Sequence, residues 1–118
     1  MLTATEAISQ GRQAGNDGNF AVARAHYAEV AKIYRDQNDV LAYAHIIRHI
    51  ADIYRQESNL VEAKPLYEES LELYRGNLGT KILDLANIVR PYALLNEEQG
   101  NLELARKLWE EASLRYLN

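Results

Sequence analysis

One block of residues occurs three times in the chain, and this repetition constrains the fold more than any other feature. Each copy opens with a turn sequence followed by a large apolar residue: Gly18-Asn19-Phe20, Ser58-Asn59-Leu60 and Gly100-Asn101-Leu102. An alanine, an aromatic residue and a tyrosine follow at fixed spacing: Ala23, Tyr27 and Tyr34; Ala63, Tyr67 and Tyr74; Ala105, Trp109 and Tyr116. This spacing places the three side chains on one face of an α-helix. The repetition therefore predicts an array of similar helical units.

The composition favours an all-α protein. Alanine, leucine, glutamate and arginine are abundant, and the 118 residues include only 2 prolines. The length fits a single domain, residues 1-118, that can bury its own core. The absence of cysteine excludes disulfides and thiolate metal sites.

The net charge and the hydropathy of the sequence limit the kinds of partner that we expect. A net charge of -4 disfavours nonspecific binding to nucleic acid or to a membrane surface. The N-terminal stretch MLTATEAISQ lacks the apolar core of a signal peptide, and no later stretch approaches the roughly 20 apolar residues of a membrane span. We therefore expect a soluble, cytoplasmic protein without nucleic-acid or membrane partners.

The apolar periodicity predicts six helices in three pairs. Their expected ranges are 4-16, 20-37, 40-57, 60-76, 81-99 and 102-117, which divide the chain into repeats of about 4-37, 40-76 and 81-117. Thr3 and Glu6 have the spacing of a capping box at the start of the first helix. Gly11 and Gly15 each cost about 1 kcal/mol relative to alanine inside a helix, so we expect the N-terminus to fray. Pro91 predicts a kink in the fifth helix.

The third predicted helix has the clearest division into two faces. Its apolar side carries Ile46, Ile47, Ile50, Ala51, Ile53 and Tyr54. Its polar side carries His45, Arg48, His49, Asp52 and Arg55. Aligning the copies places Gly11, Ala51 and Ala93 at one shared position, where a small residue allows a neighbouring helix to approach closely.

These residues resemble the tetratricopeptide repeat, which has a small residue and a tyrosine on its first helix and an alanine and an aromatic residue on its second. Two features depart from that family. The copies are 40 and 42 residues apart, from Ala23 to Ala63 and from Ala63 to Ala105, rather than about 34. The closing proline is replaced by Arg35, Arg75 and Leu117. The longer period is similar to that of the kinesin-light-chain variety.

The resemblance implies an α-solenoid of three helix pairs, wound as a right-handed superhelix, that acts as a non-enzymatic scaffold. In this family the polar faces of the first helices line a concave groove that binds peptides or partner helices. The matching residues here are Arg12 from the first copy, His45, Arg48, His49, Asp52 and Arg55 from the second, and Asn87 and Arg90 from the third. The excess of arginine predicts an acidic peptide or helix as the partner.

An alternative is that the same charges only pair with one another. Arg48 is four residues before Asp52, and Arg55 and Arg90 have Asp52, Glu97 or Glu98 as candidate partners. The carboxylate clamp that some members of this family use for chaperone C-termini is not reproduced. Its positions are occupied by Ile8, Arg12, His49, Asn87 and Pro91.

A second class of function is a metal- or small-ligand-binding sensor. His45, His49 and Asp52 share one helix face at a spacing that suits a metal site, but the sequence offers no clear further ligand, and the zinc-protease motif is absent. The chain also lacks a phosphate-binding loop, a nucleophile elbow and a reactive cysteine. We therefore expect neither a metal nor a cofactor, and no catalytic activity.

A third class is a structural protein that associates with itself. Solenoids need a polar capping face at each end. Leu104 and Leu108 occupy positions that, by alignment with the earlier copies, should face a following repeat. The sequence therefore predicts an uncovered apolar strip on the last helix and weak self-association through it.

Overall fold

The computed structural model describes residues 2–113 and contains, within that part, six α-helices and no strands. The helices are α1 (Ala4–Asn16), α2 (Phe20–Asp36), α3 (Val40–Gln56), α4 (Leu60–Arg75), α5 (Ile82–Glu98) and α6 (Leu102–Glu111). The predicted ranges are confirmed to within one residue for the first five. The predicted end of the sixth helix, with Tyr116 and Leu117, lies outside the described residues.

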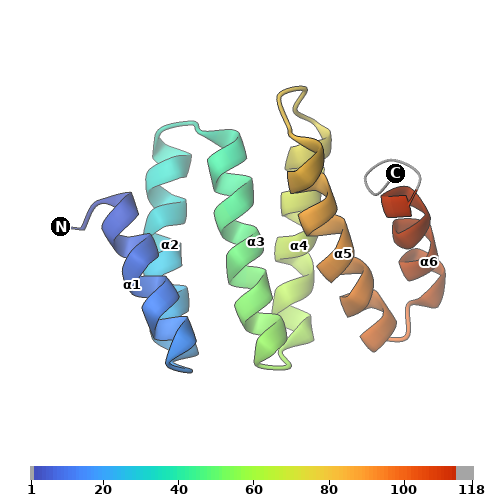
Figure 1. The fold of residues 1–118 in the computed structure, drawn as a ribbon, viewed down its shortest axis with the longest axis horizontal. Helices are drawn as coiled ribbons and strands as arrows, with labels where there is room; N and C mark the ends of the chain where they lie inside the picture. Colours follow the sequence, from blue (N-terminus) through green and yellow to red (C-terminus); the bar gives the residue numbers. More distant parts are fainter. Residues whose placement is uncertain (1, 114–118) are drawn as a thin grey trace.

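The helices form three antiparallel pairs that stand side by side (Figure 1). Each helix contacts the next one along the chain, and α3 also contacts α5. Figure 1 shows α2 and α4 behind the layer formed by α1, α3 and α5. The shortest dimension of the molecule, 21 Å, equals about two helix diameters, as a two-layered array requires. The fold is therefore an all-α helical repeat arrangement.

The turns that join the helices of a pair have one geometry. Gly18 and Gly100 adopt positive φ angles of 78° and 81°, and Ser58 takes the equivalent position with a φ of 62°. The left-handed region costs little for glycine, which explains its use in two of the three copies. Side chains cap the starts of α1, α3 and α4; at α1, Thr3 Oγ1 accepts a hydrogen bond from the amide of Glu6 at 3.1 Å.

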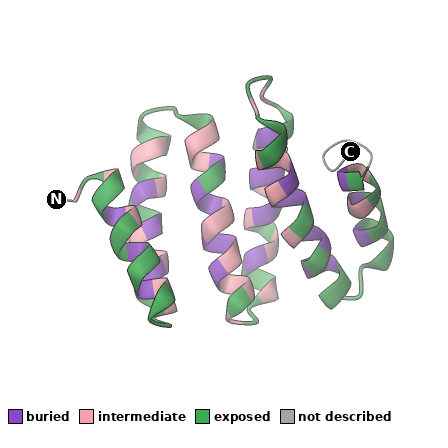
Figure 2. Cartoon of the chain, viewed as in Figure 1, coloured by how far each residue is buried: buried purple, intermediate pink, exposed green. Residues whose placement is uncertain are grey.

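The repeated alanines and aromatic residues form the core, as the sequence predicts. Ala23, Ala63 and Ala105 are at most 2% exposed, and Tyr67 is fully buried. The apolar side of α3 supplies residues to both hydrophobic clusters: the isoleucines to an N-terminal one, and Ala44 and Ala51 to a C-terminal one. Figure 2 shows these buried positions along the inward sides of the helices. The central helix thus joins the two halves of the core.

The small residues at the shared close-contact position are all buried. A Cβ atom on Gly11 would lie 2.9 Å from Cε1 of Tyr27 and 3.3 Å from Cβ of His26, whereas one on Gly15 would lie 3.9 Å from Cβ of Ala23. Gly15→Ala should therefore stabilise the protein by about 0.5–1 kcal/mol, because alanine favours the helix and meets only ordinary contacts.

Gly11→Ala should give no such gain, because the Tyr27 ring has to move. Urea unfolding of both variants measures the difference. Equal stabilisation by the two substitutions would mean that α1 and α2 are not in close contact at Gly11.

The predicted apolar strip at the C-terminal end is wrong for Leu108. This side chain is only 3% exposed and belongs to the C-terminal core cluster with Leu71 and Tyr92. This cluster also contains side chains of α3, α4 and α5, so Leu108 faces the helices that precede it and not a following repeat, whereas its equivalent in the second copy, Leu66, packs against both clusters. Leu104, at 36% exposed, is on the surface as predicted.

The surface of α6 combines exposed Leu102 and Leu104 with charged side chains. Arg106 forms ion pairs with Glu103, at 2.7 Å, and with Glu110. This arrangement gives the described end of the array the charged surface that a repeat protein needs against water.

Candidate functional site

A pocket of about 330 Å³ lies between α3 and α5, on the polar sides of these two helices. Its lining consists of Arg48, Asp52, Arg55 and Gln56 from α3 and Asn87, Arg90, Pro91 and Leu94 from α5. We call it the α3–α5 pocket. Positions three and four residues apart share a helix face, which is why each helix presents these residues together. Five of the eight predicted groove residues therefore meet in one place.

The other three predicted groove residues are not in the lining of this pocket. His45 and His49 lie on α3 outside the pocket lining, and Arg12 is exposed on α1. Arg12 nevertheless acts on its surroundings, because its charge opposes the rise that burial causes in the pKa of Tyr27 and adds to the lowering that burial causes in the pKa of His49. The predicted groove thus divides into the α3–α5 pocket and a histidine-containing part nearer to α1.

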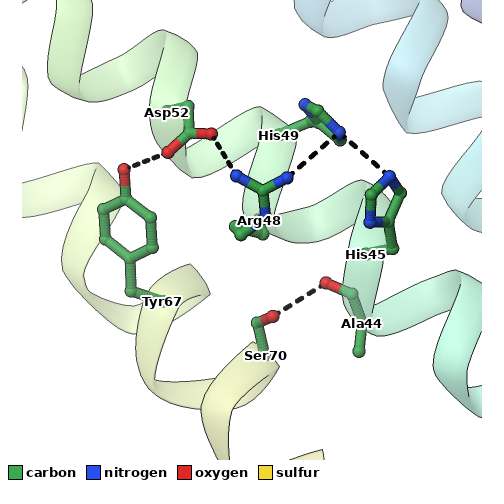
Figure 3. A network of polar contacts seen from close by, with 7 residues as sticks. All are labelled: Ala44, His45, Arg48, His49, Asp52, Tyr67 and Ser70. Carbon is green, nitrogen blue, oxygen red and sulfur yellow. Dashed lines mark hydrogen bonds and ion pairs between the residues drawn. The ribbon is translucent and has the colours of Figure 1, made fainter. Parts of the chain in front are cut away.

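A chain of hydrogen bonds holds the polar side of α3 in place (Figure 3). The Tyr67 hydroxyl, from α4, donates to Oδ1 of Asp52 at 2.5 Å, and Nη1 of Arg48 donates to Oδ2 of Asp52 at 2.9 Å. Nη2 of Arg48 lies 3.4 Å from Nε2 of His49, which lies 3.1 Å from Nε2 of His45. Both oxygens of Asp52 and two nitrogens of Arg48 are therefore engaged within the protein.

The chain of hydrogen bonds indicates which ring nitrogen of each histidine carries the proton. Arginine can only donate, so Nε2 of His49 accepts and its ring proton is on Nδ1. Nε2 of His49 has a single lone pair, so Nε2 of His45, at 3.1 Å, donates to it in competition with Arg48 at 3.4 Å. Both rings are consistent with the neutral form.

Burial and charge agree with this assignment. Burial, together with Arg48, His45 and Arg12, lowers the pKa of His49 to about 3. Burial and Arg48 likewise lower the pKa of His45, although Asp84 and Asp52 oppose the effect. Burial raises the pKa of Asp52, while the Tyr67 hydrogen bond and the Arg48 charge oppose that rise.

The arginines of the pocket differ in how far they are neutralised. Arg48 is paired with Asp52 and its side chain is only 13% exposed. Arg55 lies 3.6 Å from Glu98, whose side chain is 46% exposed, so this ion pair is long and open to solvent. For Arg90, which is exposed, residues 2–113 provide no ion pair. Ion pairing within residues 2–113 therefore neutralises Arg48 but leaves the charge of Arg90 available to a ligand.

The histidine face does not form a metal site in the described part of the chain. No group of three or more His, Cys, Asp or Glu side chains within residues 2–113 is arranged to hold a metal ion. The physical reason is local: the Nε2 atoms of His45 and His49 are directed at each other, and Asp52 is held by Tyr67 and Arg48. The sensor hypothesis therefore has no structural support from these residues.

Four residues of the site are not among the eight predicted groove residues: Gln56, Pro91 and Leu94 of the pocket lining, and Tyr67 behind it. Gln56 lies four residues after Asp52 and hence on the same face, which the helical period could have indicated. Tyr67 was assigned only to the core, and nothing in the sequence indicates that its hydroxyl reaches across to α3.

A second and larger cavity, of about 540 Å³, lies between α4 and α6 over Tyr92. We call it the α4–α6 cavity. Its charged lining residues are Glu68, Glu72, Arg75, Lys107 and Glu111. Three acids and two bases give this lining a net charge of -1. Three arginines and one aspartate give the α3–α5 pocket a net charge of +2.

Among the helices that the structure describes, none combines the length and the apolar character needed to cross a membrane. A comparison with models of known protein families finds no match, and a search of curated proteins finds no similar sequence.

Proposed function

We propose that the protein is a non-enzymatic scaffold, built from three tetratricopeptide-like repeats, that binds an acidic peptide or helix of a partner protein in the α3–α5 pocket. The observation that carries the proposal is the meeting of Arg55, Asn87 and Arg90 in a pocket with a net charge of +2 on a protein with a net charge of -4.

The charge distribution supports an acidic partner at this surface. Arg90 has no ion pair within residues 2–113, and the contact of Arg55 with Glu98 is long enough to be exchanged for a better one. A charge-assisted hydrogen bond from arginine contributes more than a neutral one, and its planar fork suits carboxylates. The α4–α6 cavity is larger but negative, which disfavours the same partner there.

The hydrogen bonds that join Tyr67, Asp52 and Arg48 support a binding site that is ordered before the partner arrives. Tyr67 and Asp52 hold Arg48 against α3, so the floor of the pocket is in place before a partner arrives. A binding surface that is already ordered loses less conformational entropy on association.

The test is capture of peptides from a synthetic array containing acidic, neutral and basic series. The wild type should retain acidic peptides, and an Arg55→Glu, Arg90→Glu variant should lose about 100-fold or more in affinity, because two attractive contacts become repulsive.

A Lys32→Glu, Lys81→Glu variant is the matched control, since it changes the net charge equally at exposed sites that line neither the α3–α5 pocket nor the α4–α6 cavity. It should bind almost as well as the wild type. If the two double variants lose affinity equally, net charge and not the α3–α5 pocket determines binding.

A further inference from the structure

The charges and donors of the α3–α5 pocket exceed what one carboxylate can use. We propose that the pocket takes a phosphoryl group, carried by a phosphorylated serine or threonine of the partner segment. This inference rests on the proposed function and specifies which acidic group the pocket selects.

The first argument is charge. The lining contributes +2 in total, because the single acid, Asp52, is offset by one of the three arginines. A carboxylate would neutralise only half of that charge. A phosphoryl group carries about -1.5 to -2 at neutral pH and so matches it.

The second argument is the placement of the donors. Arg55 belongs to α3, whereas Arg90 and Asn87 belong to α5, so N–H groups approach the pocket from both walls. A planar carboxylate has two oxygens, which one arginine fork occupies. A phosphoryl group has three strong acceptor oxygens in a tripod and can accept from both walls at once.

Arg48 contributes charge to the pocket but few new hydrogen bonds. Two of its nitrogens already contact Asp52 and His49, and its side chain is only 13% exposed. Arg55 and Arg90 are therefore the residues that contact the phosphoryl oxygens. Asp52 also attracts Arg55 electrostatically, but its two oxygens already accept hydrogen bonds from Tyr67 and Arg48, which weakens its competition for Arg55.

Glu98 is the intramolecular competitor. It occupies one side of Arg55 at 3.6 Å, beyond good hydrogen-bond distance, and its side chain is about half exposed. A phosphoryl group can displace it because the Glu98 side chain can turn into water. Glu98 therefore holds the position beside Arg55 that the phosphoryl group must take.

The test uses two capped amino-acid probes, N-acetyl-phosphoserine methylamide and N-acetyl-glutamate methylamide. Each is titrated into the full-length protein, and the side-chain N–H signals of Arg55 and Arg90 are followed by NMR. We expect the phosphoserine probe to bind at least about tenfold more tightly than the glutamate probe, and Arg90→Gln to abolish the difference.

Glu98→Gln should raise the affinity for the phosphoserine probe about threefold, since it removes the competing charge. Glu29→Gln, on the exposed side of α2, is the matched control and should change nothing. A decrease in affinity on Glu98→Gln would overturn the role of Glu98 as a competitor.

The result that overturns the phosphoryl proposal is equal affinity for the two probes at Arg55 and Arg90. In that case the pocket binds single carboxylates, and the proposed function stands without it. Loss of acidic-peptide binding altogether would instead refute the proposed function. Probe signals that shift only residues of the α4–α6 cavity would refute both.

Discussion

Replacing Leu108 by glutamate is expected to destabilise the protein by about 4 kcal/mol or more. Leu108 is 3% exposed and packs with Leu71 and Tyr92, so the substitution removes buried apolar contacts and places a carboxylate among them. Truncating a buried leucine alone costs about 2–5 kcal/mol, and an unpaired buried charge adds to this.

Leu104→Glu is the matched control on the same helix. Its side chain is 36% exposed, so the expected cost is under about 1 kcal/mol. Urea unfolding monitored by circular dichroism measures both variants. Equal, small effects would mean that Leu108 is on the surface, as the sequence alone predicts.

Lowering the pH from 7.5 to 5 is expected to cost the protein about 1–2 kcal/mol of stability through His49. The pKa of His49 is about 3 in the folded protein and about 6.5 in an unfolded chain. Between these values the unfolded state holds a proton that the folded state does not, so the stability present above pH 6.5 is lost as the pH falls. One pKa unit corresponds to about 1.4 kcal/mol, reduced here because the ring is partly exposed.

The charged groups near His49 all lower its pKa. Arg48 and His45 contact it within α3, Arg12 acts from α1, and the uncharged ring of Tyr27 lies 5.9 Å away on α2. Asp52 has a raised pKa and acts in the opposite direction at lower pH, so the comparison stops at pH 5.

The measurement is the free energy of unfolding in urea at both pH values, for the wild type and for His49→Gln. Glutamine cannot take up the proton, so the variant should lose less stability on acidification by about 1–2 kcal/mol. Identical losses in the two proteins would show that His49 is as easily protonated when folded as when unfolded.

Much of the fold could be predicted from spacing alone. The repeated alanine and aromatic residues, such as Ala63 and Tyr67, have helical periodicity, and their burial follows because an amphipathic helix buries its apolar side. The small residues at the close-contact position were predicted by alignment of the copies, since only a small side chain permits that approach.

The periodicity could not predict which neighbour each face meets. It correctly places Leu108 and Leu66 at equivalent positions of their helices. Which neighbouring helix that position contacts depends on how successive helix pairs stack. The sequence-based prediction assigned the wrong direction to Leu108, which the structure places against preceding helices, whereas Leu66 packs against both clusters.

The candidate site likewise has features that could be predicted from the sequence and features that could not. Asp52, Arg55 and Arg90 share the α3–α5 pocket as predicted, because each lies on the polar side of a first helix. Which charges are already satisfied could not be predicted, since the hydroxyl of Tyr67 reaches Asp52 from another helix. Under the proposed function, that contact makes Arg48 part of the support and leaves Arg55 and Arg90 to contact the partner.

The central claim is that the α3–α5 pocket is where a partner binds. The most direct measurement is an NMR titration of the isotope-labelled protein with the acidic peptide that it retains best from the array. We predict that the largest signal changes occur at Arg55, Asn87, Arg90 and Leu94. Largest changes at Leu104 and Lys107 of the α4–α6 cavity, with the signals of the α3–α5 pocket unmoved, would contradict the account.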